Sequence, residues 1–439
     1  MRVLIAAVLA VLLGSPCYAQ QIRAGYAKED ITPTGPVQMG GYNLREGLSE
    51  GVYDGDRLFV RAICLSDGAT SVLFVESDLI DTQETAAFRE RIAAATGIPK
   101  DHILTGDAHN HAAPMPDPNG KSAFDQRYNE AIVAAAKRAV ANLQPVRIAA
   151  GQGRSRVAMN RRQVRPADSY SEMTFDENEA SQSFGKAKTD KPVKVKEFGG
   201  VVRLGANPTG PSDDAVQLVR IDDTTGKPIA AMIHYACHGT SLGGRNGKVS
   251  GEWMGRMQAH AEKQIPGLGA IFVQGAAGDI NPRVVGGLDG HKDDVHATWA
   301  LGDEIGAEVV RVYRQLDPQP IEARIELVTK EIELPRTYRE LFQDFRNTVV
   351  RVPTTVVRIG PLMWVTFPGE LFSTIGKQVK AACPAPYAHL MGYTNGSVSY
   401  LPTQEAFSQG GYEPAVSDFD PTAEPIYMRE IAALLKNFP

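Results

Sequence analysis

The residues of this 439-residue sequence that are best suited to metal binding or catalysis are two histidines, His109 and His111. They stand two apart in a polar run that directly follows a short apolar segment, 103–105, and catalytic side chains commonly follow strand ends. In an extended backbone residues i and i+2 point the same way, so both imidazoles are expected to face one pocket. One ring then suits a metal and the other a substrate or a metal-bound water. A chance pair of surface histidines is the alternative interpretation of this spacing.

Three other polar residues also come at the ends of apolar runs. His238 ends an apolar strand and precedes Gly-Thr-Ser, which indicates a cleft, whereas His234 lies inside that strand and is expected to be a core or supporting residue. Glu370 follows Pro-Gly after the apolar run 365–367. A helix that starts there would also explain this acid, because the helix dipole favours a negative charge at its first turn. Tyr400 ends a further strand, but its spacing alone does not nominate it as a ligand.

Short apolar strands alternate with helical patterns along the chain, which predicts a mixed α/β fold with a single catalytic domain and its site at strand ends. The expected strands cover 58–65, 71–78, 103–105, 216–221, 229–236, 270–274, 321–334, 354–359, 362–367 and 389–394. The expected helices cover 82–96, 125–143, 255–264, 301–316 and 371–383. Segment 166–199 is highly charged and poor in apolar residues, which predicts a mobile surface insertion; a lid over the site is the alternative.

The composition is that of an ordinary soluble protein, with 43% hydrophobic residues and a formal net charge of −5. The sequence has no dense block of Lys and Arg, which argues against a nucleic-acid partner. Residues 1–19 have the pattern of a signal peptide cut after Ala19, with an uncleaved anchor as the alternative. We therefore expect a secreted or periplasmic protein without a transmembrane segment. Three cysteines remain after cleavage, an odd number that argues against a disulfide framework, and Cys64 and Cys237 are expected to be buried thiols.

Six motifs occur in the order in which they are found in neutral ceramidases. The run 106–114 resembles the His-Thr-His-Ser-Gly-Pro signature of that family, and 159–162 resembles its Asn-Arg motif. The further matches are strands 216–220 and 226–229 with the turn 238–242, the loop 275–282, Pro-Gly-Glu at 368–370, and 399–403. They extend collinearly from about Ala24 to Tyr412. The chain thus resembles the zinc hydrolase domain of the neutral/alkaline non-lysosomal ceramidases, here over 20–439, and is expected to lack the C-terminal immunoglobulin-like domain of that family.

The resemblance implies a zinc site with one position left for water. The four ligands that it implies are His109, His238, Glu370 and Tyr400. Two imidazoles and a carboxylate are also a ligand set that catalytic zinc favours. Zinc lowers the pKa of bound water toward ~7 and polarises the scissile carbonyl. The resemblance further implies two catalytic residues near the amide: His111 would pass a proton, and Arg161 would stabilise developing negative charge.

One departure from the family bears on the substrate. Asn281 stands where the family has a serine in Gly-Asp-x-Ser-Pro, and an amide cannot act as a nucleophile, although it can hydrogen-bond a substrate oxygen. Asn281 and Asp279 are therefore predicted to bind substrate. The prediction is a secreted zinc amidohydrolase that acts through zinc-bound water on an N-acyl, ceramide-like or other lipid-like compound. One alternative is a non-catalytic binding protein that keeps the fold. Another is a metallophosphoesterase, whose Asp-x-His and Gly-Asn-His motifs we do not find. The sequence does not predict an oligomeric state.

Overall fold

The computed structural model describes residues 21–438, apart from 43–44, 46, 83–84, 118, 166–171, 176–186, 192–200, 289–293 and 338–347. The predicted signal peptide lies outside the described residues, and so does most of the predicted insertion at 166–199. None of the described helices is long and apolar enough to cross a membrane.

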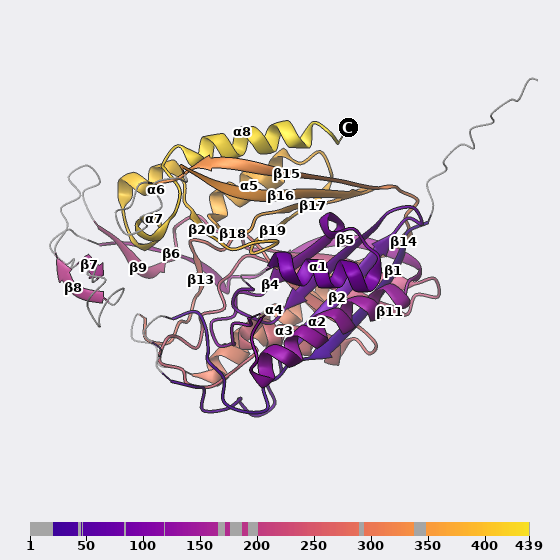
Figure 1. The fold of residues 1–439 in the computed structure, drawn as a ribbon, viewed down its shortest axis with the longest axis horizontal. Coiled ribbons are helices and arrows are strands. Elements are labelled where there is room, and N and C mark those ends of the chain that lie inside the picture. The colour runs from indigo at the N-terminus through magenta and orange to yellow at the C-terminus, as the bar shows by residue number, and fades with distance from the viewer. Residues whose placement is uncertain are drawn as a thin grey trace, which may run out of the picture.

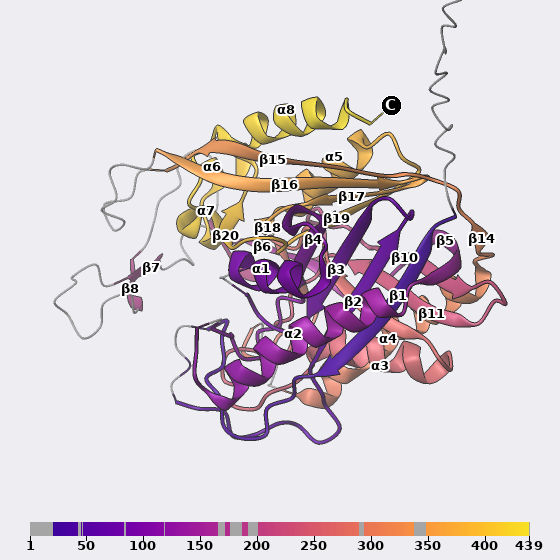
Figure 2. The same ribbon diagram turned by 45° about the vertical axis from the view of Figure 1, so that its right-hand side comes forward.

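The described elements form four layers, in the order helices, sheet, sheet, helices (Figures 1 and 2). The larger sheet has the strand order β12-β11-β10-β5-β1-β2-β3-β4, with β14 attached to β5. Its strands are β1 (Arg23–Asp30), β2 (Phe59–Ser66), β3 (Ser71–Ser77), β4 (Ile103–Asp107), β5 (Gln144–Arg154), β10 (Ala215–Asp223), β11 (Pro228–Tyr235), β12 (Gly269–Gln274) and β14 (Gln319–Pro320). Most neighbours are antiparallel, but β3–β4 and β11–β12 are parallel. Nε2 of Gln274, at the end of β12, donates to the backbone oxygen of Ala108, directly after β4, so the carboxyl ends of these two strands meet.

The smaller sheet packs face to face on the larger one. Its strand order is β15 (Ile325–Pro335), β16 (Val349–Ile359), β17 (Leu362–Thr366) and β19 (Tyr387–Met391). Trp364 and Met391 from this sheet belong to the same buried apolar cluster as Phe74 and Ile271 from the larger sheet. The opposite face of the smaller sheet is covered by α5 (Ser373–Ala382) and α8 (Ala423–Leu435), which share a second cluster with it.

Four helices cover the outer face of the larger sheet. Helices α1 (Thr85–Thr96) and α2 (Ala123–Ala141) pack on the half that holds β1 to β4, and α3 (Glu252–Gln264) and α4 (Val295–Gln315) pack on the half that holds β10 to β12. Helix α2 begins at a capping box, in which the Ser122 hydroxyl and the Asp125 carboxylate each accept a backbone N–H. Its apolar stripe, including Phe124, Tyr128 and Ile132, faces the sheet.

Smaller pairings join these layers near the site. They are the three-stranded sheet β13 (Ile280–Pro282), β6 (Ala158–Arg165) and β9 (Val201–Asn207), the parallel pair β18 (Gly369–Leu371) and β20 (Val398–Leu401), and the hairpin β7 (Glu172–Phe175) and β8 (Ala187–Lys191). The short helices are η1 (Lys100–His102), α6 (Gln404–Gln409) and α7 (Tyr412–Val416).

The predicted mixed α/β fold is confirmed, and every predicted strand and helix has a counterpart. Several boundaries are wrong: the helix expected from residue 301 begins at Val295, and the strand expected from residue 354 begins at Val349. The helix expected from residue 371 begins at Ser373, and Glu370 lies in strand β18 instead. The reason is its parallel pairing with β20, which puts Glu370 opposite Tyr400. Cys64 and Cys237 are buried free thiols as predicted, and Cys383 is free and partly buried.

Candidate active site

His109 occupies a strained turn directly after β4. Its φ is 55°, in the left-handed region that few non-glycine residues adopt and that recurs at functional sites. The extended backbone predicted for 109–111 is therefore wrong, although the His109 and His111 rings do lie together. The turn stacks the His109 ring on that of Tyr393, with 4.1 Å between centroids. Tyr393 has a φ of 52°, so two strained residues pack on each other.

Backbone carbonyls fix which nitrogen carries the proton in two of the imidazoles. Nδ1 of His109 lies 3.1 Å from the carbonyl oxygen of Ile80. Nδ1 of His238, which follows β11, lies 2.8 Å from that of Ala277 and 2.9 Å from that of Ile280. A carbonyl oxygen only accepts, so each Nδ1 carries a hydrogen and each Nε2 presents a lone pair. Metal-binding histidines usually donate their second ring N–H to a carbonyl in this way, which fixes the orientation of the ring.

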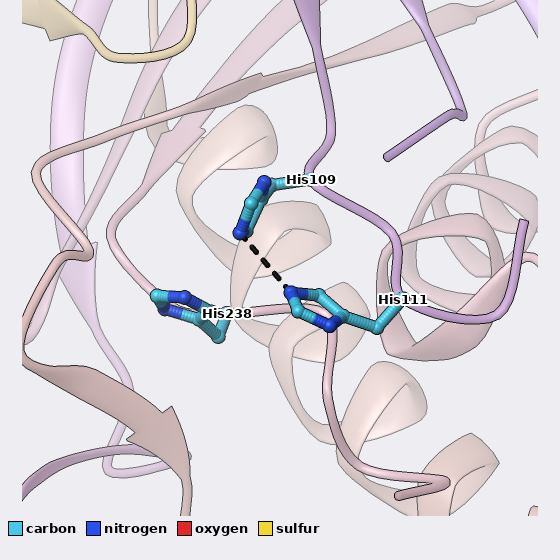
Figure 3. Close-up of side chains that lie close together, drawn as sticks. All are labelled: His109, His111 and His238. Atoms are coloured by element: carbon cyan, nitrogen blue, oxygen red, sulfur yellow. Dashed lines mark hydrogen bonds between the residues drawn. The ribbon is translucent and has the colours of Figure 1, made fainter. Parts of the chain in front are cut away.

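These lone pairs converge on one point with a carboxylate. Nε2 of His111 lies 3.1 Å from Nε2 of His109 (Figure 3). Nη1 of Arg161 lies 3.0 Å from Nε2 of His238. Oε2 of Glu370 lies 3.0 Å from Nε2 of His238 and 3.7 Å from Nε2 of His109. The histidines that follow β4 and β11 of the larger sheet therefore meet Arg161 of β6 and Glu370 of β18 within one small space.

The contact between His238 and Glu370 identifies what this space can hold. Burial, together with the charge of Arg161, keeps the pKa of His238 well below its ordinary value, so the ring is neutral. A neutral ring with its hydrogen on Nδ1 offers only a lone pair to Glu370, and two lone-pair atoms 3.0 Å apart repel each other unless positive charge lies beside them, which Arg161 supplies here and a metal ion would supply more directly. A metal ion fits this donor set. The ligand atoms of His109, His111 and His238 all lie within 4.8 Å of one another, which makes His111 a further possible ligand.

The remaining groups around Glu370 are tyrosines. The Tyr393 hydroxyl donates to Oε2 of Glu370 over 3.4 Å, and the Tyr400 side chain also hydrogen-bonds this carboxylate. Burial and the charge of Glu370 raise the pKa of Tyr400 well above its ordinary value, while Arg161 opposes the shift. In this structure Tyr400 is therefore a neutral phenol beside the point where the lone pairs meet.

Arg161 on β6 is held by a buried ion-pair network. Its Nε donates to Oε1 of Glu413 over 2.8 Å, and its Nη1 also donates to Oδ1 of Asn281 over 3.2 Å. The second oxygen of Glu413 accepts from Nη1 of Arg162 over 2.7 Å. Glu413 is only 1% exposed, so the two guanidinium groups are the charges that compensate it. The network fixes Arg161 between His238 and Asn281.

The site opens into a cavity of about 650 Å³. His111, Arg161, Asn281 and Tyr400 line its inner end. The rest of the lining is largely apolar and includes Tyr42, Leu204, Val285, Leu288 and Tyr412. This shape suits a substrate with one reactive polar group and an apolar chain.

Two of the residues discussed from the sequence lie elsewhere. Asp279 is not among the described residues that line the cavity; its carboxylate accepts from the Ser373 amide over 2.7 Å and from Nδ2 of Asn160 over 2.9 Å. His234 is buried between the sheets, where Nε1 of Trp364 donates to its Nε2 over 3.3 Å and the His389 ring stacks on it. The expectation that His234 is a core residue agrees with this position.

The structure brings the other predicted residues together: His109, His111, Arg161, His238, Asn281, Glu370 and Tyr400. Sequence reasoning missed Tyr393, Glu413 and Arg162. The only local signal for Glu413 was the Gly-Gly-Tyr-Glu-Pro run at 410–414, which reads as a turn.

A family comparison places these residues in context. The sequence model of the family described as neutral/alkaline non-lysosomal ceramidase, N-terminal, matches residues 22–307, which is more than half of the chain. The chain belongs to this ceramidase family. The match includes His109, His238 and Arg161, whereas Glu370 and Tyr400 lie beyond it.

Individual relatives agree with this assignment. Neutral ceramidase A and neutral ceramidase B of Dictyostelium discoideum are each 26% identical to the chain, over 164 and 163 residues. The aligned stretch is 32% of this chain and 23% of each relative, so it spans about a quarter of their length. The crystal structure of the neutral ceramidase from Pseudomonas aeruginosa superimposes with a TM-score of 0.70 at 17% identity, over 96% of this chain and 75% of that chain. A structure described as ceramidase complexed with C2 gives a TM-score of 0.69 at 17% identity, over 96% and 76% of the two chains. At these identities the superpositions establish the fold.

Proposed function

We propose that this protein is a zinc-dependent amidohydrolase that cleaves the amide bond of an N-acyl, ceramide-like compound. The observation that carries the proposal is the convergence of three donor atoms: Oε2 of Glu370 lies 3.0 Å from Nε2 of His238 and 3.7 Å from Nε2 of His109, as the ligands of one metal ion would. Membership in the ceramidase family supports amide hydrolysis as the reaction.

Four residues would hold the metal: His109, His238, Glu370 and Tyr400. Zinc bound there would polarise the scissile carbonyl and lower the pKa of a water molecule. Burial keeps the pKa of His109 well below its ordinary value, which leaves its Nε2 lone pair available. The Nδ1–carbonyl hydrogen bonds of His109 and His238 hold both rings in the tautomer that metal binding requires.

Two residues of the chain would act on the substrate. The Arg161 guanidinium lines the cavity beside His238, where it can bind the carbonyl oxygen as negative charge develops. His111 has its ring beside that of His109 and also lines the cavity. Burial, with the nearby His238 and Arg161, keeps the pKa of His111 well below its ordinary value, so the ring is neutral before the reaction. As the C–N bond breaks, the oxygen of water stays on the acyl carbon and His111 passes a proton to the leaving amine.

The test is a combined measurement of metal content and hydrolysis. Metal-free protein is titrated with Zn²⁺ and assayed against ceramide, N-acyl amino acids and acylated sugars. We expect activity on at least one N-acyl amide to rise with zinc and to level off at one equivalent. Zinc binding without hydrolysis of any N-acyl compound would favour a non-catalytic binding protein, the interpretation to which Asn281 lends some support. Hydrolysis that is unaffected by removing the metal would contradict the proposal.

We also propose that the protein is exported through its N-terminal segment. The support is the sequence of residues 1–19, with Arg2 ahead of an apolar run and the small-x-small site Cys17-Tyr18-Ala19 at its end. Sequencing of the N-terminus of protein recovered outside the cytoplasm should begin at Gln20. Protein that retains Met1 and stays inside the cell would contradict export.

A further inference from the structure

The orientation of the Asn281 amide is fixed by its neighbours. Arginine only donates hydrogen bonds, so the atom of Asn281 that lies 3.2 Å from Nη1 of Arg161 must be the oxygen. The same oxygen accepts from Oγ1 of Thr240 over 3.3 Å. The other polar atom of the amide, Nδ2, is a donor, and within the described parts of the chain no acceptor contacts it. Because Asn281 lines the cavity, its free N–H groups are available to a bound molecule.

Arg161 supplies a second unused donor. Its Nε donates to Glu413, and its Nη1 donates to His238 and Asn281. Its Nη2 is buried and has no hydrogen-bond partner among the described residues. A buried donor without an acceptor destabilises the protein, so a ligand oxygen that accepted from this guanidinium would gain binding free energy.

The polar part of the described cavity lining is cationic. Arg161 stands at its inner end and Arg245 in the loop after His238, and no Asp or Glu is among the described lining residues. A third guanidinium, that of Arg45, lies directly behind the lining and donates to the backbone oxygen of His111 over 2.9 Å. The centre of the Arg45 guanidinium is 5.1 Å from the ring centroid of Tyr42, which does line the cavity. Arg161 is paired with the buried Glu413, so Arg245 and Arg45 supply the positive charge that attracts an anionic ligand to this recess.

We propose that the substrate carries an anionic group on the amine side of its amide, as in an N-acyl amino acid, and that Asn281 and Arg245 recognise it. The inference rests on the proposed amidohydrolase function and specifies its substrate class. The amide carbonyl takes the position beside Arg161, and the apolar lining takes the acyl chain. The α-carboxylate is close to the amide in such a compound, so it can accept from Nδ2 of Asn281 while Arg245 attracts it. A neutral amine half would leave Nδ2 of Asn281 without a charged acceptor.

Two substrates with the same acyl chain, which differ only in the charge on the amine side of the amide, measure the effect of that charge. N-lauroylglycine has the carboxylate, and N-lauroylglycinamide replaces it with a neutral amide of nearly the same shape. The ratio of kcat/KM for the two compounds is measured on the zinc-loaded full chain. Their dissociation constants are measured by calorimetry on the metal-free chain, in which binding is separate from hydrolysis. We expect the anionic compound to be favoured about tenfold or more in both ratios, the range of a charge-assisted hydrogen bond.

Three variants test the residues named. Asn281→Asp keeps the shape and the oxygen that accepts from Arg161, but it replaces the free donor with a negatively charged acceptor. It should lower the preference for the anion by about tenfold or more. Arg245→Gln removes an exposed charge and should lower the preference by about three- to fivefold. Arg351→Gln is the matched control, because Arg351 is an exposed arginine on β16 and is not among the described residues that line the cavity. Its ratios should equal those of the unmodified chain.

The outcomes separate this inference from the proposed function. Tighter binding of N-lauroylglycine supports the anion site even when no N-acyl compound, ceramide included, is hydrolysed, a result that refutes the amidohydrolase alone. Equal turnover and equal affinity for both compounds overturn the anion site and leave the amidohydrolase intact. If Asn281→Asp loses its zinc or its fold, the test falls to Arg245→Gln. The inference is overturned if Arg245→Gln prefers the anionic compound as strongly as Arg351→Gln does.

Discussion

Replacing Arg161 with Ala should remove most of the turnover without removing the metal. Neighbouring Arg162 provides a matched control, since each arginine contributes one hydrogen bond to the same buried carboxylate, that of Glu413. Only Arg161 also contacts His238 and Asn281. The difference between Arg161→Ala and Arg162→Ala therefore reports what Arg161 does in the site, after their shared structural cost is subtracted.

The expected magnitudes follow from these contacts. Removing one partner of a buried ion pair costs about 3–5 kcal/mol when the other charge is left alone. Here Glu413 keeps its second arginine, so each variant should lose roughly 2–3 kcal/mol of unfolding free energy. Loss of an oxyanion donor lowers kcat by about 10²–10³-fold, and this applies to Arg161 alone. Zinc affinity should hold or rise in Arg161→Ala, because the variant removes a positive charge and a donor from Nε2 of His238.

The assay compares urea unfolding, zinc content and steady-state kinetics for the two variants on any confirmed substrate. An interaction made only in the transition state lowers kcat and kcat/KM together. Turnover in Arg161→Ala within about threefold of that in Arg162→Ala, well short of the loss of an oxyanion donor, would refute the assigned role.

The remaining predictions concern the histidines. His238→Ala should lose zinc, whereas His234→Ala should keep zinc and lose stability. The zinc content of the two variants tests this, and the opposite pattern would make His234 the ligand and His238 the core residue. His111→Ala should retain zinc and lose about 10²–10⁴-fold in turnover, so a loss of zinc there would make His111 a ligand. His389→Phe should reduce the acid sensitivity of the metal-free protein. Burial, reinforced by Lys380, lowers the pKa of His389 from 6.5 to about 3 when the chain folds. The unfolded chain thus binds an extra proton below pH 6.5, and stability falls toward pH 3 by about 1.4 kcal/mol per pH unit. Urea unfolding at pH 7.5 and pH 5.5 measures this slope, and an unchanged slope in the variant would contradict the assignment.

The sequence predicted the parts of the fold whose pattern is local. Strands β4, β11 and β12 are buried along almost their whole length, so their ends are visible in the sequence, and the polar residues that follow them reach the site. Strand β1 was missed because its sequence, Arg-Ala-Gly-Tyr-Ala-Lys-Glu-Asp, is half polar and is a strand only because β2 pairs along its full length. Helix α8 has a proline in its first turn and is fixed by packing on the smaller sheet.

The site could be predicted as a set of residues but not as a geometry. The left-handed turn at His109 depends on contact with Tyr393, which lies far away in the sequence. The role of Glu413 exists only because α7 brings its carboxylate to Arg161. The Asn281 amide has a defined orientation only because Arg161 fixes its oxygen. In each case a long-range contact supplies information that no local pattern contains.

The division of the candidate site between the two sheets has a consequence for how the protein matures. His109 and His238 follow strands of the larger sheet, whereas Glu370 and Tyr400 belong to the pair that follows the smaller sheet. Because the chain is synthesised from its N-terminus, both imidazoles are present long before the carboxylate and the phenol are added. The complete set of proposed ligands exists only after the sheets have docked, a late and slow event because it joins distant segments. Zinc would then be captured by the finished chain and not by its folding intermediates, and its binding would stabilise the docked state over the open one. Metal retention would be a direct measure of completed assembly in a purified sample.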